Sequence, residues 1–349
     1  FRKALLNELK NKQYNLILIS PIDKYYLKIS KFFTKKENLF LVRSSENPLL
    51  EIITLLHLLF FYLKYKPDLV HHFTIKPCIY GGIVARLTGI KNRINHVTGL
   101  GPSFFSNRRK IKYVNKLLFP FYRYAFNDDK NNLINIFHNN SDKNTFIKKS
   151  IAKAWQTKTI QGSGVNINHY TYDIKRKFNK EINLLFPARL IKEKGIVELI
   201  NACNDLWNSN YKFTLNIAGE IDTQNRSYLK NKFFKLIQKN PNIKLLGKCN
   251  SMREIYKKMD IVILPSWREG LSKSLLESAA MSLPIITTNV PGCNDIIIDE
   301  HSGLLVPSRN KEKIKAAIKK YFKNPELAIK FGENARKTVV KNFTIEIIN

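Results

Sequence analysis

The sequence predicts an α/β protein of two domains, each built on a doubly wound parallel sheet. Short apolar runs of strand length alternate with longer helical segments along the chain. This alternation is typical of β-α-β units, in which a helix connects neighbouring parallel strands. A chain of 349 residues also favours two domains over one. Gly162 and Gly164 predict a hinge between a first domain, 1–164, and a second, 165–349.

The first domain is expected to begin with a helix, because residues 1–10 have a helical pattern. The strand that should precede this helix would then be missing, so we expect the chain to be a fragment. Proline in the first turn and glycine at the end predict a helix at 77–89. The expected strands are 15–20, 39–43, 68–74, 93–98, 133–138 and 158–161, and the other expected helices are 48–66, 107–126 and 141–151.

The most apolar run of the chain, 52–63, lies within the expected helix 48–66. It is too short to span a bilayer, which takes roughly 20 residues. It also contains His57. We therefore expect a buried helix here in preference to an interfacial segment.

The charge balance indicates a polyanionic partner. The chain holds 59 Lys and Arg against 27 Asp and Glu, a net charge of +32, and residues 1–164 alone hold 28 basic and 9 acidic residues. Nucleic acid, an anionic membrane surface or a phosphorylated substrate would each fit this charge. General drift toward Lys, Asn and Ile is the alternative explanation. The four scattered cysteines form no C-x-x-C pair, which favours a reducing, cytoplasmic compartment.

The segment 107–126 has the pattern of a basic amphipathic helix that also carries aromatic residues. Such helices lie on anionic membranes, where each basic residue contributes about 1 kcal/mol. The alternative is an ordinary surface helix packed on the sheet, and no known nucleic-acid-binding motif is present. The candidates for a membrane-facing surface are Arg108, Arg109, Lys110, Lys112, Lys116 and Arg123.

The second domain is organised around a β-α-β unit at 261–294, whose expected helix is 271–281. Glu269 lies in the turn before this helix and Glu277 lies inside it. Backbone N–H groups of 270–274 at the helix start form an anion site, and carboxylates accept hydrogen bonds from hydroxyls. N–H donors beside two carboxylates indicate a binding site for a sugar nucleotide. The alternative is that Glu269 and Glu277 are solvated surface acids without a ligand. The other expected strands are 182–188, 213–218, 243–247, 261–264 and 284–288, and the closing helices are 311–322 and 325–342, the last expected to cross back to the first domain.

The segment EGLSKSLLE at 269–277 resembles the E-x7-E signature of retaining glycosyltransferases, in particular glycosyltransferase family 4 with its GT-B fold. SLPIITTNVPGCNDII and SGLLVP, which follow it, also match that family, and the likeness covers most of the chain. The resemblance implies two Rossmann-like doubly wound domains facing across a cleft, with acceptor and donor sides. The variant HVTGLG at 96–101 resembles a subgroup that builds bacterial surface polysaccharides on a lipid carrier.

By this resemblance, Glu269 would hold hydroxyls of the transferred sugar and Glu277 the ribose hydroxyls. Arg189 and Lys194 would contact the donor diphosphate, so Glu269, Lys194 and Arg189 are the catalytic candidates. The further donor-binding candidates are Gly270, Leu271, Ser272, Lys273, Ser274 and Asn250, the last at the nucleotide base. The acceptor-side candidates are His96, Thr98 and Gly99, although a strand histidine is more often structural.

The implied reaction is a retaining, metal-independent transfer from a nucleotide-sugar, most commonly a UDP-sugar. The acceptor would be a saccharide or a polyprenyl-diphosphate-linked saccharide in cell-surface polysaccharide synthesis, with no cofactor. No D-x-D metal motif is present, since Asp128-Asp129 lacks the spacing. The alternatives are a sugar-nucleotide epimerase or phosphorylase of the same fold and a basic nucleic-acid-binding protein. We expect a cytoplasmic protein, peripheral at the inner face of the plasma membrane.

Overall fold

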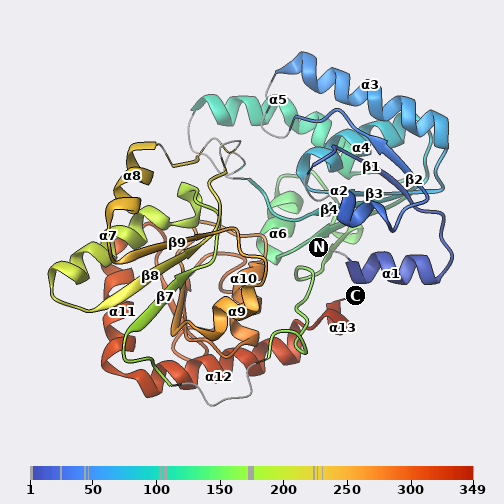
Figure 1. The fold of residues 1–349 in the computed structure, drawn as a ribbon. Coiled ribbons are helices and arrows are strands. Elements are labelled where there is room, and N and C mark those ends of the chain that lie inside the picture. Colours follow the sequence, from blue (N-terminus) through green and yellow to red (C-terminus); the bar gives the residue numbers. More distant parts are fainter. Residues whose placement is uncertain are drawn as a thin grey trace. The chain divides into compact units, whose positions relative to one another are not determined.

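The computed structural model describes residues 3–348 apart from 24–25, 43–44, 46, 102–103, 105–108, 172–176, 223–224, 226 and 230. The side chains of 3–4, 109–115, 231–232 and 235–236 also lie outside the described part. The chain divides into two compact units, Phe1–Ser163 and Gly164–Ile348. In Figure 1 the first is drawn in blue to green and the second in green to red.

The first unit contains a four-stranded parallel sheet in the order β3-β4-β5-β6 and a separate parallel pair, β1-β2. Helix α4 packs against both α3 and α5. The strands are β1 (Ile17–Ser20), β2 (Lys35–Asn38), β3 (Leu69–Phe73), β4 (Asn92–Val97), β5 (Asn132–Phe137) and β6 (Thr157–Thr159). The helices are α1 (Lys3–Asn11), α2 (Tyr26–Ser30), α3 (Pro48–Tyr65), α4 (Ile75–Leu87), α5 (Arg109–Phe126), α6 (Asn140–Lys148) and the 3₁₀ turn η2 (Ala154–Gln156).

The strand expected at 39–43 is wrong, because the strand lies just before it. β2 pairs with β1 in the register Ile17↔Lys35 to Ser20↔Asn38. Its sequence is polar, so backbone pairing defines the strand and an apolar pattern does not. The apolar run that follows inserts Leu39 into the core but leaves Phe40 and Val42 exposed.

The expectation that 52–63 forms a buried helix is also wrong. Asn47 caps α3, its side chain accepting a hydrogen bond from the Leu49 N–H, and Lys66 ends the helix in the left-handed conformation. The buried residues of α3 face the core, but only 22% of the helix is buried. Hydrophobic periodicity indicates a helix without showing whether both of its faces are covered.

A buried polar network fixes the first sheet to its helices. The His72 Nδ1 donates to the Asn95 Oδ1 at 2.8 Å, and its Nε2 accepts from the Tyr62 hydroxyl at 2.8 Å. A Cβ on Gly81 would lie 2.3 Å from the His72 Nε2, so only glycine lets α4 approach this ring. Both ring nitrogens are therefore satisfied in the neutral form, and burial lowers the pKa of His72 to about 4.

His72 is expected to make stability depend on pH. Because its pKa is lower in the folded chain, the unfolded chain binds the proton more readily between about pH 6.5 and 4. The stabilisation is complete above pH 6.5 and is lost as the pH falls toward 4, by about 3 kcal/mol in total. Urea unfolding across this range should show a smaller pH dependence in His72→Gln than in the wild type. Equal dependence in both chains would contradict this role.

The second unit is one six-stranded parallel sheet in the order β12-β11-β10-β7-β8-β9, covered by helices and built on a core of buried apolar residues. Along the chain, β8 and β9 are added on one side of β7, whereas β10, β11 and β12 are added on its other side. The strands are β7 (Ile182–Phe186), β8 (Phe213–Ala218), β9 (Ile243–Gly247), β10 (Ile261–Leu264), β11 (Ile285–Thr288) and β12 (Leu304–Val306). The helices are the 3₁₀ turn η3 (Lys192–Lys194), α7 (Ile196–Asn208), α8 (Asn231–Lys239), α9 (Met252–Lys257), α10 (Lys273–Ala280), α11 (Lys311–Lys323), α12 (Pro325–Asn342) and α13 (Ile345–Ile348).

Candidate functional site

The loops that follow β7 and β10 meet at the point where the strand order of the second sheet reverses. Ligands of open parallel sheets bind at such switch points, beyond the carboxyl ends of the strands. Lys194 follows β7 and Glu269 follows β10, and their Nζ and Oε1 atoms lie 2.5 Å apart. Ser266 donates its hydroxyl to the same Glu269 oxygen at 2.7 Å. Both charged side chains are largely buried, Lys194 at 19% and Glu269 at 10% exposure.

Two glycines allow the loops to approach so closely. A Cβ on Gly195 would lie 2.0 Å from the Pro265 carbonyl oxygen, and a Cβ on Gly292 would lie 2.6 Å from the Glu269 Cβ. Both have positive φ, 75° and 81°, which side chains rarely adopt. The Glu269 N–H donates to the Pro291 carbonyl at 3.2 Å. The segment after β11 therefore holds Glu269 in place through its backbone.

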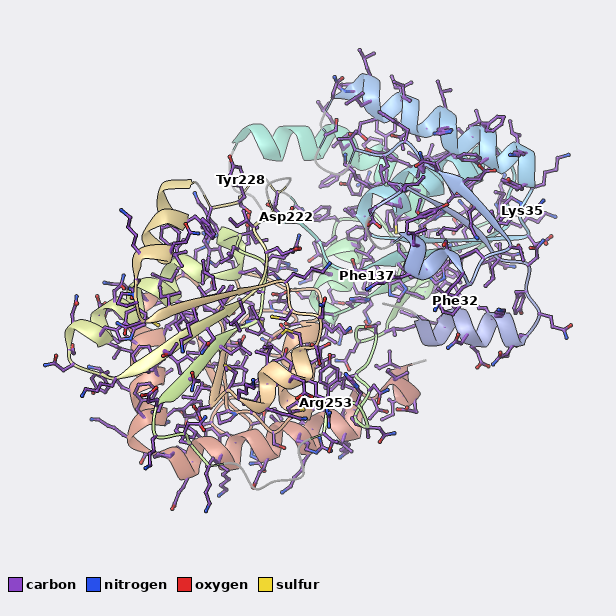
Figure 2. The ribbon with its side chains drawn as sticks, in the orientation of Figure 1. Phe32, Lys35, Phe137, Asp222, Tyr228 and Arg253 are labelled. Atoms are coloured by element: carbon purple, nitrogen blue, oxygen red, sulfur yellow. The ribbon has the colours of Figure 1, made fainter. Side chains whose placement is uncertain are left out.

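Arg189 pairs with a different carboxylate from Lys194. Its guanidinium forms an ion pair with Asp222, on the segment between β8 and α8. Figure 2 labels Asp222 and Tyr228 on this segment. The Tyr228 backbone also makes an isolated bridge to Ile191. Arg189 is 43% exposed, so its charge remains accessible to solvent.

Helix α10 begins two residues later than expected, with Ser272 at the N-cap position. The Ser272 side chain makes no capping bond and lies 3.3 Å from the Ser274 hydroxyl. The first N–H groups of a helix have no partner within the helix, so they attract an anion. The remaining expected donors occupy this same turn: Gly270 and Leu271 precede the cap, and Lys273 is the first residue of the helix.

Glu277 is buried in α10 at 6% exposure. The Tyr256 hydroxyl of α9 lies 3.4 Å from its Oε2, and Lys273 lies 3.4 Å from its Oε1. Tyr170 also donates to this carboxylate, and burial together with the Glu277 charge raises the pKa of the Tyr170 phenol. Burial and the Glu277 charge also raise the pKa of the Tyr256 phenol, so both phenols stay protonated. A carboxylate has about four acceptor positions, so Glu277 keeps capacity for further hydroxyls.

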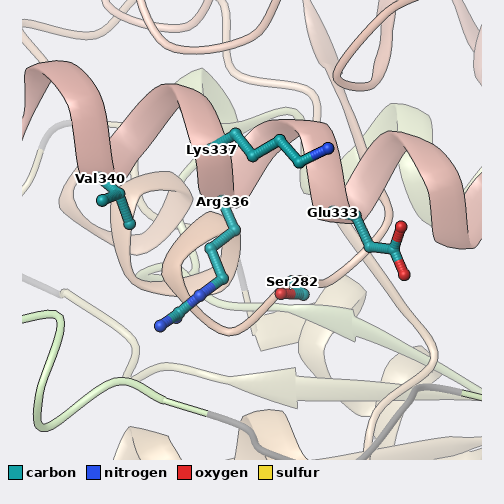
Figure 3. Close-up of a pocket in the computed structure, with 5 residues that line it drawn as sticks. All are labelled: Ser282, Glu333, Arg336, Lys337 and Val340. Carbon is teal, nitrogen blue, oxygen red and sulfur yellow. The ribbon is translucent and has the colours of Figure 1, made fainter.

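Arg336 of α12 connects the parts that surround Glu277. It donates to the Tyr170 carbonyl at 3.2 Å and to the Ala280 carbonyl at the end of α10. Figure 3 shows Arg336 lining a hollow on α12; its lining residues are Ser282, Glu333, Arg336, Lys337 and Val340. None of the predicted site residues lines it.

Several of these contacts were missed by sequence reasoning. Ser266 and Gly292 lie inside the β-α-β unit predicted at 261–294, so their positions were visible but their contacts were not. Tyr170, Tyr256 and Asp222 carry no local signal, because each acts across a long stretch of chain. Asn250, the candidate for the base, is exposed in the loop between β9 and α9.

The acceptor-side candidates lie at the carboxyl ends of the first sheet. His96 is buried at the end of β4, and its Nε2 lies 3.0 Å from the His138 Nε2. The His96 ring also stacks on Phe73 at 5.3 Å. Thr98 and Gly99 follow β4 in the loop that leads to Leu100, whose N–H donates to the Asp142 carboxylate. His138 is a partner that sequence reasoning missed.

The candidates for a membrane-facing surface are only partly described. Arg108 lies outside the described residues, as do the side chains of Arg109, Lys110 and Lys112. Lys116 is exposed on α5. Arg123 donates to the carbonyls of Ser150 and Lys149, at 3.1 and 3.4 Å, just past the end of α6. Arg123 therefore stabilises the end of that helix.

Among the residues that the structure describes, no group of three His, Cys, Asp or Glu side chains could hold a metal ion. Asp128 forms a buried ion pair with Arg93, and Asp129 pairs with Lys153. Each of these two carboxylates thus has a cation of its own.

Two family models match the chain. A glycosyl transferase 4-like model covers residues 1–139, and a glycosyl transferases group 1 model covers residues 172–338. Together the two models cover most of the chain, which is therefore a glycosyltransferase with a group 1 domain at 172–338. This confirms the family that the E-x7-E segment indicated.

Known relatives of this glycosyltransferase extend over most of its length. The capsular polysaccharide biosynthesis glycosyltransferase CapM of Staphylococcus aureus is 26% identical over 309 residues, 85% of this chain and 78% of that protein. The UDP-Gal:alpha-D-GlcNAc-diphosphoundecaprenol alpha-1,3-galactosyltransferase of Escherichia coli is 27% identical over 356 residues, 97% of this chain and 87% of that protein.

A solved structure of the same fold is Anabaena Alr3699/HepE in complex with UDP-glucose. It matches with a TM-score of 0.77 and 17% identity, over 99% of this chain and 92% of that one. At this identity the likeness concerns the fold alone. It confirms the predicted class, an α/β protein of two Rossmann-like domains.

Proposed function

We propose that this glycosyltransferase moves a sugar, with retention, from a UDP-sugar to a saccharide carried on a polyprenyl diphosphate, in the synthesis of a cell-surface polysaccharide. The names of the relatives support this choice. CapM is named for capsular polysaccharide, and the E. coli enzyme for a UDP-sugar donor and a diphosphoundecaprenol-linked acceptor. The solved relative was crystallised with UDP-glucose.

The observation that carries the proposal is the position of Lys194 and Glu269 at the switch point, directly before α10. A diphosphate at the start of α10 would meet N–H groups of the first turn of the helix and the Lys194 ammonium. The Ser272 N–H is not one of them, because it donates to the Gly292 carbonyl at 3.1 Å. Glu277 would then accept the ribose hydroxyls, since its carboxylate is already oriented by Tyr256 and Tyr170. Glu269 would accept hydroxyls of the sugar. Arg189, whose side chain is exposed, would add a second cation.

In the proposed reaction, the bond between the anomeric carbon and the diphosphate oxygen breaks, and a bond to the acceptor oxygen forms on the same face. The acceptor hydroxyl loses its proton to an oxygen of the leaving diphosphate. Charge develops mainly on that diphosphate, so preorganised donors and cations aimed at it lower the barrier. The site needs no side chain as general base for this route. Excluding water from the bound donor would limit hydrolysis.

Chelation of divalent metals is expected to leave the transfer intact. Lys194 and the N–H groups at the start of α10 supply the positive charge that a metal ion supplies elsewhere. Initial rates measured with and without EDTA should agree. Loss of activity with EDTA, restored by adding Mg²⁺ or Mn²⁺, would contradict metal independence.

The function is tested by incubating the full chain with labelled UDP-sugars and a polyprenyl-diphosphate-linked saccharide. We expect label in the lipid fraction, dependent on the acceptor, and the same anomeric configuration in donor and product. Conversion of the donor without any acceptor would indicate an epimerase. Steeply salt-sensitive DNA binding with no binding of nucleotide-sugars would indicate a nucleic-acid-binding protein.

An acceptor on a lipid carrier requires the enzyme to work beside a membrane. The excess of 28 basic over 9 acidic residues in 1–164 supports attraction to anionic lipid, as do the basic residues of α5. The enzyme would then be cytoplasmic and peripheral at the inner face of the plasma membrane.

A further inference from the structure

Helix α3 presents a row of large apolar side chains to solvent. By length and composition, α3 is a helix that could cross a membrane, with a mean hydropathy of 1.4. The members of this row, which we call the α3 apolar face, are Leu49 (69% exposed), Ile52 (50%), Ile53 (47%), Leu56 (59%), Phe60 (57%) and Leu63 (55%). Monomeric soluble proteins rarely expose contiguous apolar patches of this kind without an interaction to explain them.

The α3 apolar face is one continuous stripe. At 3.6 residues per turn, its members lie within an arc of about 100° around the helix axis. The buried residues Thr54, Leu58, Phe61 and Tyr62 lie on the opposite side. No charged residue falls within the stripe. Lys64 and Lys66 lie at its carboxyl-terminal end, where Lys64 pairs with Glu37 of β2 at 2.8 Å and Lys66 is exposed. An apolar stripe with cations at its edge is the pattern of a helix that lies in a membrane interface.

The opposite side of α3 is committed to the first unit, so the helix cannot leave it to span a bilayer. Glu51 forms an ion pair with Lys76 at 2.8 Å and accepts from the Tyr80 hydroxyl at 2.6 Å. The Tyr62 hydroxyl donates to His72 in the buried network. Inserting α3 across a membrane would break these contacts. The helix therefore stays on the unit and meets any partner side-on, along its exposed stripe.

Charge decides between a lipid surface and a second copy of the chain. Residues 1–164 carry 28 basic and 9 acidic residues, so pairing through this face would bring two positively charged units together. An anionic bilayer attracts the same charge, and its interface accepts the apolar side chains. The proposed lipid-linked acceptor also places the substrate in a bilayer, and to that extent the choice of partner rests on the proposed function.

We propose that the α3 apolar face is a docking surface for an anionic lipid bilayer, with α3 parallel to the membrane plane and its large side chains at the boundary of headgroups and acyl chains. Lys66, which is exposed at the end of the stripe, contacts anionic headgroups. The face adds apolar anchoring to the electrostatic attraction of the basic residues in 1–164.

The test is co-sedimentation of the full chain with vesicles of phosphatidylcholine alone and with about one-third phosphatidylglycerol. Leu56→Glu is compared with Ile298→Glu, which makes the same charge change at a residue 53% exposed in the second unit. We expect the wild type and Ile298→Glu to bind the mixed vesicles alike, and Leu56→Glu to bind about tenfold more weakly. Thermal unfolding of each variant verifies that it is folded.

A second measurement probes insertion directly and does not depend on lost binding. Phe60→Trp places an indole on the stripe, and its fluorescence should shift to shorter wavelength and be quenched by lipids brominated on the acyl chain. Equal vesicle binding by Leu56→Glu and Ile298→Glu, or an indole signal in Phe60→Trp that lipid leaves unchanged, would overturn the proposal. A wild-type dimer in sedimentation velocity that Leu56→Glu dissociates, without vesicle binding, would assign the face to a second copy.

The failure of this inference can be separated from failure of the proposed function. Transfer to a short-chain acceptor dissolved in detergent should be the same in Leu56→Glu and the wild type, because the substitution lies outside the site of the second unit. If the wild type binds vesicles through α3 but transfers no sugar, the docking surface stands and the proposed reaction falls. If sugar is transferred but α3 plays no part in vesicle binding, the reaction stands and the docking surface falls.

Discussion

Replacing Lys194 with alanine is expected to lower kcat about 10²–10³-fold with little change in KM. The ammonium of Lys194 would neutralise charge that appears on the diphosphate as it leaves, so it would stabilise the transition state more than the bound donor. The ion pair with Glu269, and the close packing of the next residue, Gly195, on Pro265, fix the position of the ammonium. Steady-state rates with a UDP-sugar and a lipid-linked acceptor measure the effect.

Lys192→Ala is the matched control for that variant. Lys192 lies in the same 3₁₀ turn but is exposed, so its removal should leave kcat unchanged. Because Glu269 would lose its ion-pair partner in Lys194→Ala, thermal unfolding must show that the variant is still folded at the assay temperature. A kcat for Lys194→Ala equal to that of Lys192→Ala would remove Lys194 from the proposed mechanism.

Replacing Glu277 with alanine is expected to raise the Kd for UDP about 10–100-fold. The variant would lose charge-assisted hydrogen bonds to ribose hydroxyls, worth about 1.5–3 kcal/mol in total. Tyr256→Phe should cause a smaller rise, since it loosens the carboxylate without removing it. Isothermal titration of each variant with UDP measures these changes.

Comparing the affinities for UDP and 2′-deoxy-UDP tests whether Glu277 contacts the ribose 2′-hydroxyl. The wild type should bind 2′-deoxy-UDP more weakly than UDP, and Glu277→Ala should bind the two with nearly equal affinity. Glu326→Ala, at an exposed residue of α12, is a control that should keep the wild-type preference. If Glu277→Ala still discriminates between the two nucleotides as the wild type does, Glu277 does not hold the ribose.

The sequence was informative where local pattern and spacing decide the structure. The β10 strand at 261–264, its turn and the following helix could be predicted from one apolar run and the residues after it, and this unit carries Glu269 and Glu277. The family could be predicted from the same segment. The eight-residue spacing between Glu269 and Glu277 is a property of the sequence, so it does not depend on where α10 begins.

Contacts made across long stretches of chain could not be predicted. Tyr170 and Tyr256 contact Glu277 from distant parts of the sequence, and the Asp222 partner of Arg189 lies on another loop. The strand β2 was misplaced because its pairing with β1 is made by the backbone of a polar segment. The apolar composition of α3 indicated burial, although one side of that helix faces outward.

A crystal structure of the full chain with UDP bound tests the central claim most directly. We expect the diphosphate at the start of α10 beside Lys194, and the ribose hydroxyls within hydrogen-bond distance of the Glu277 carboxylate. UDP bound elsewhere on the chain, or bound with Lys194 and Glu277 turned away from it, would contradict the proposed donor site.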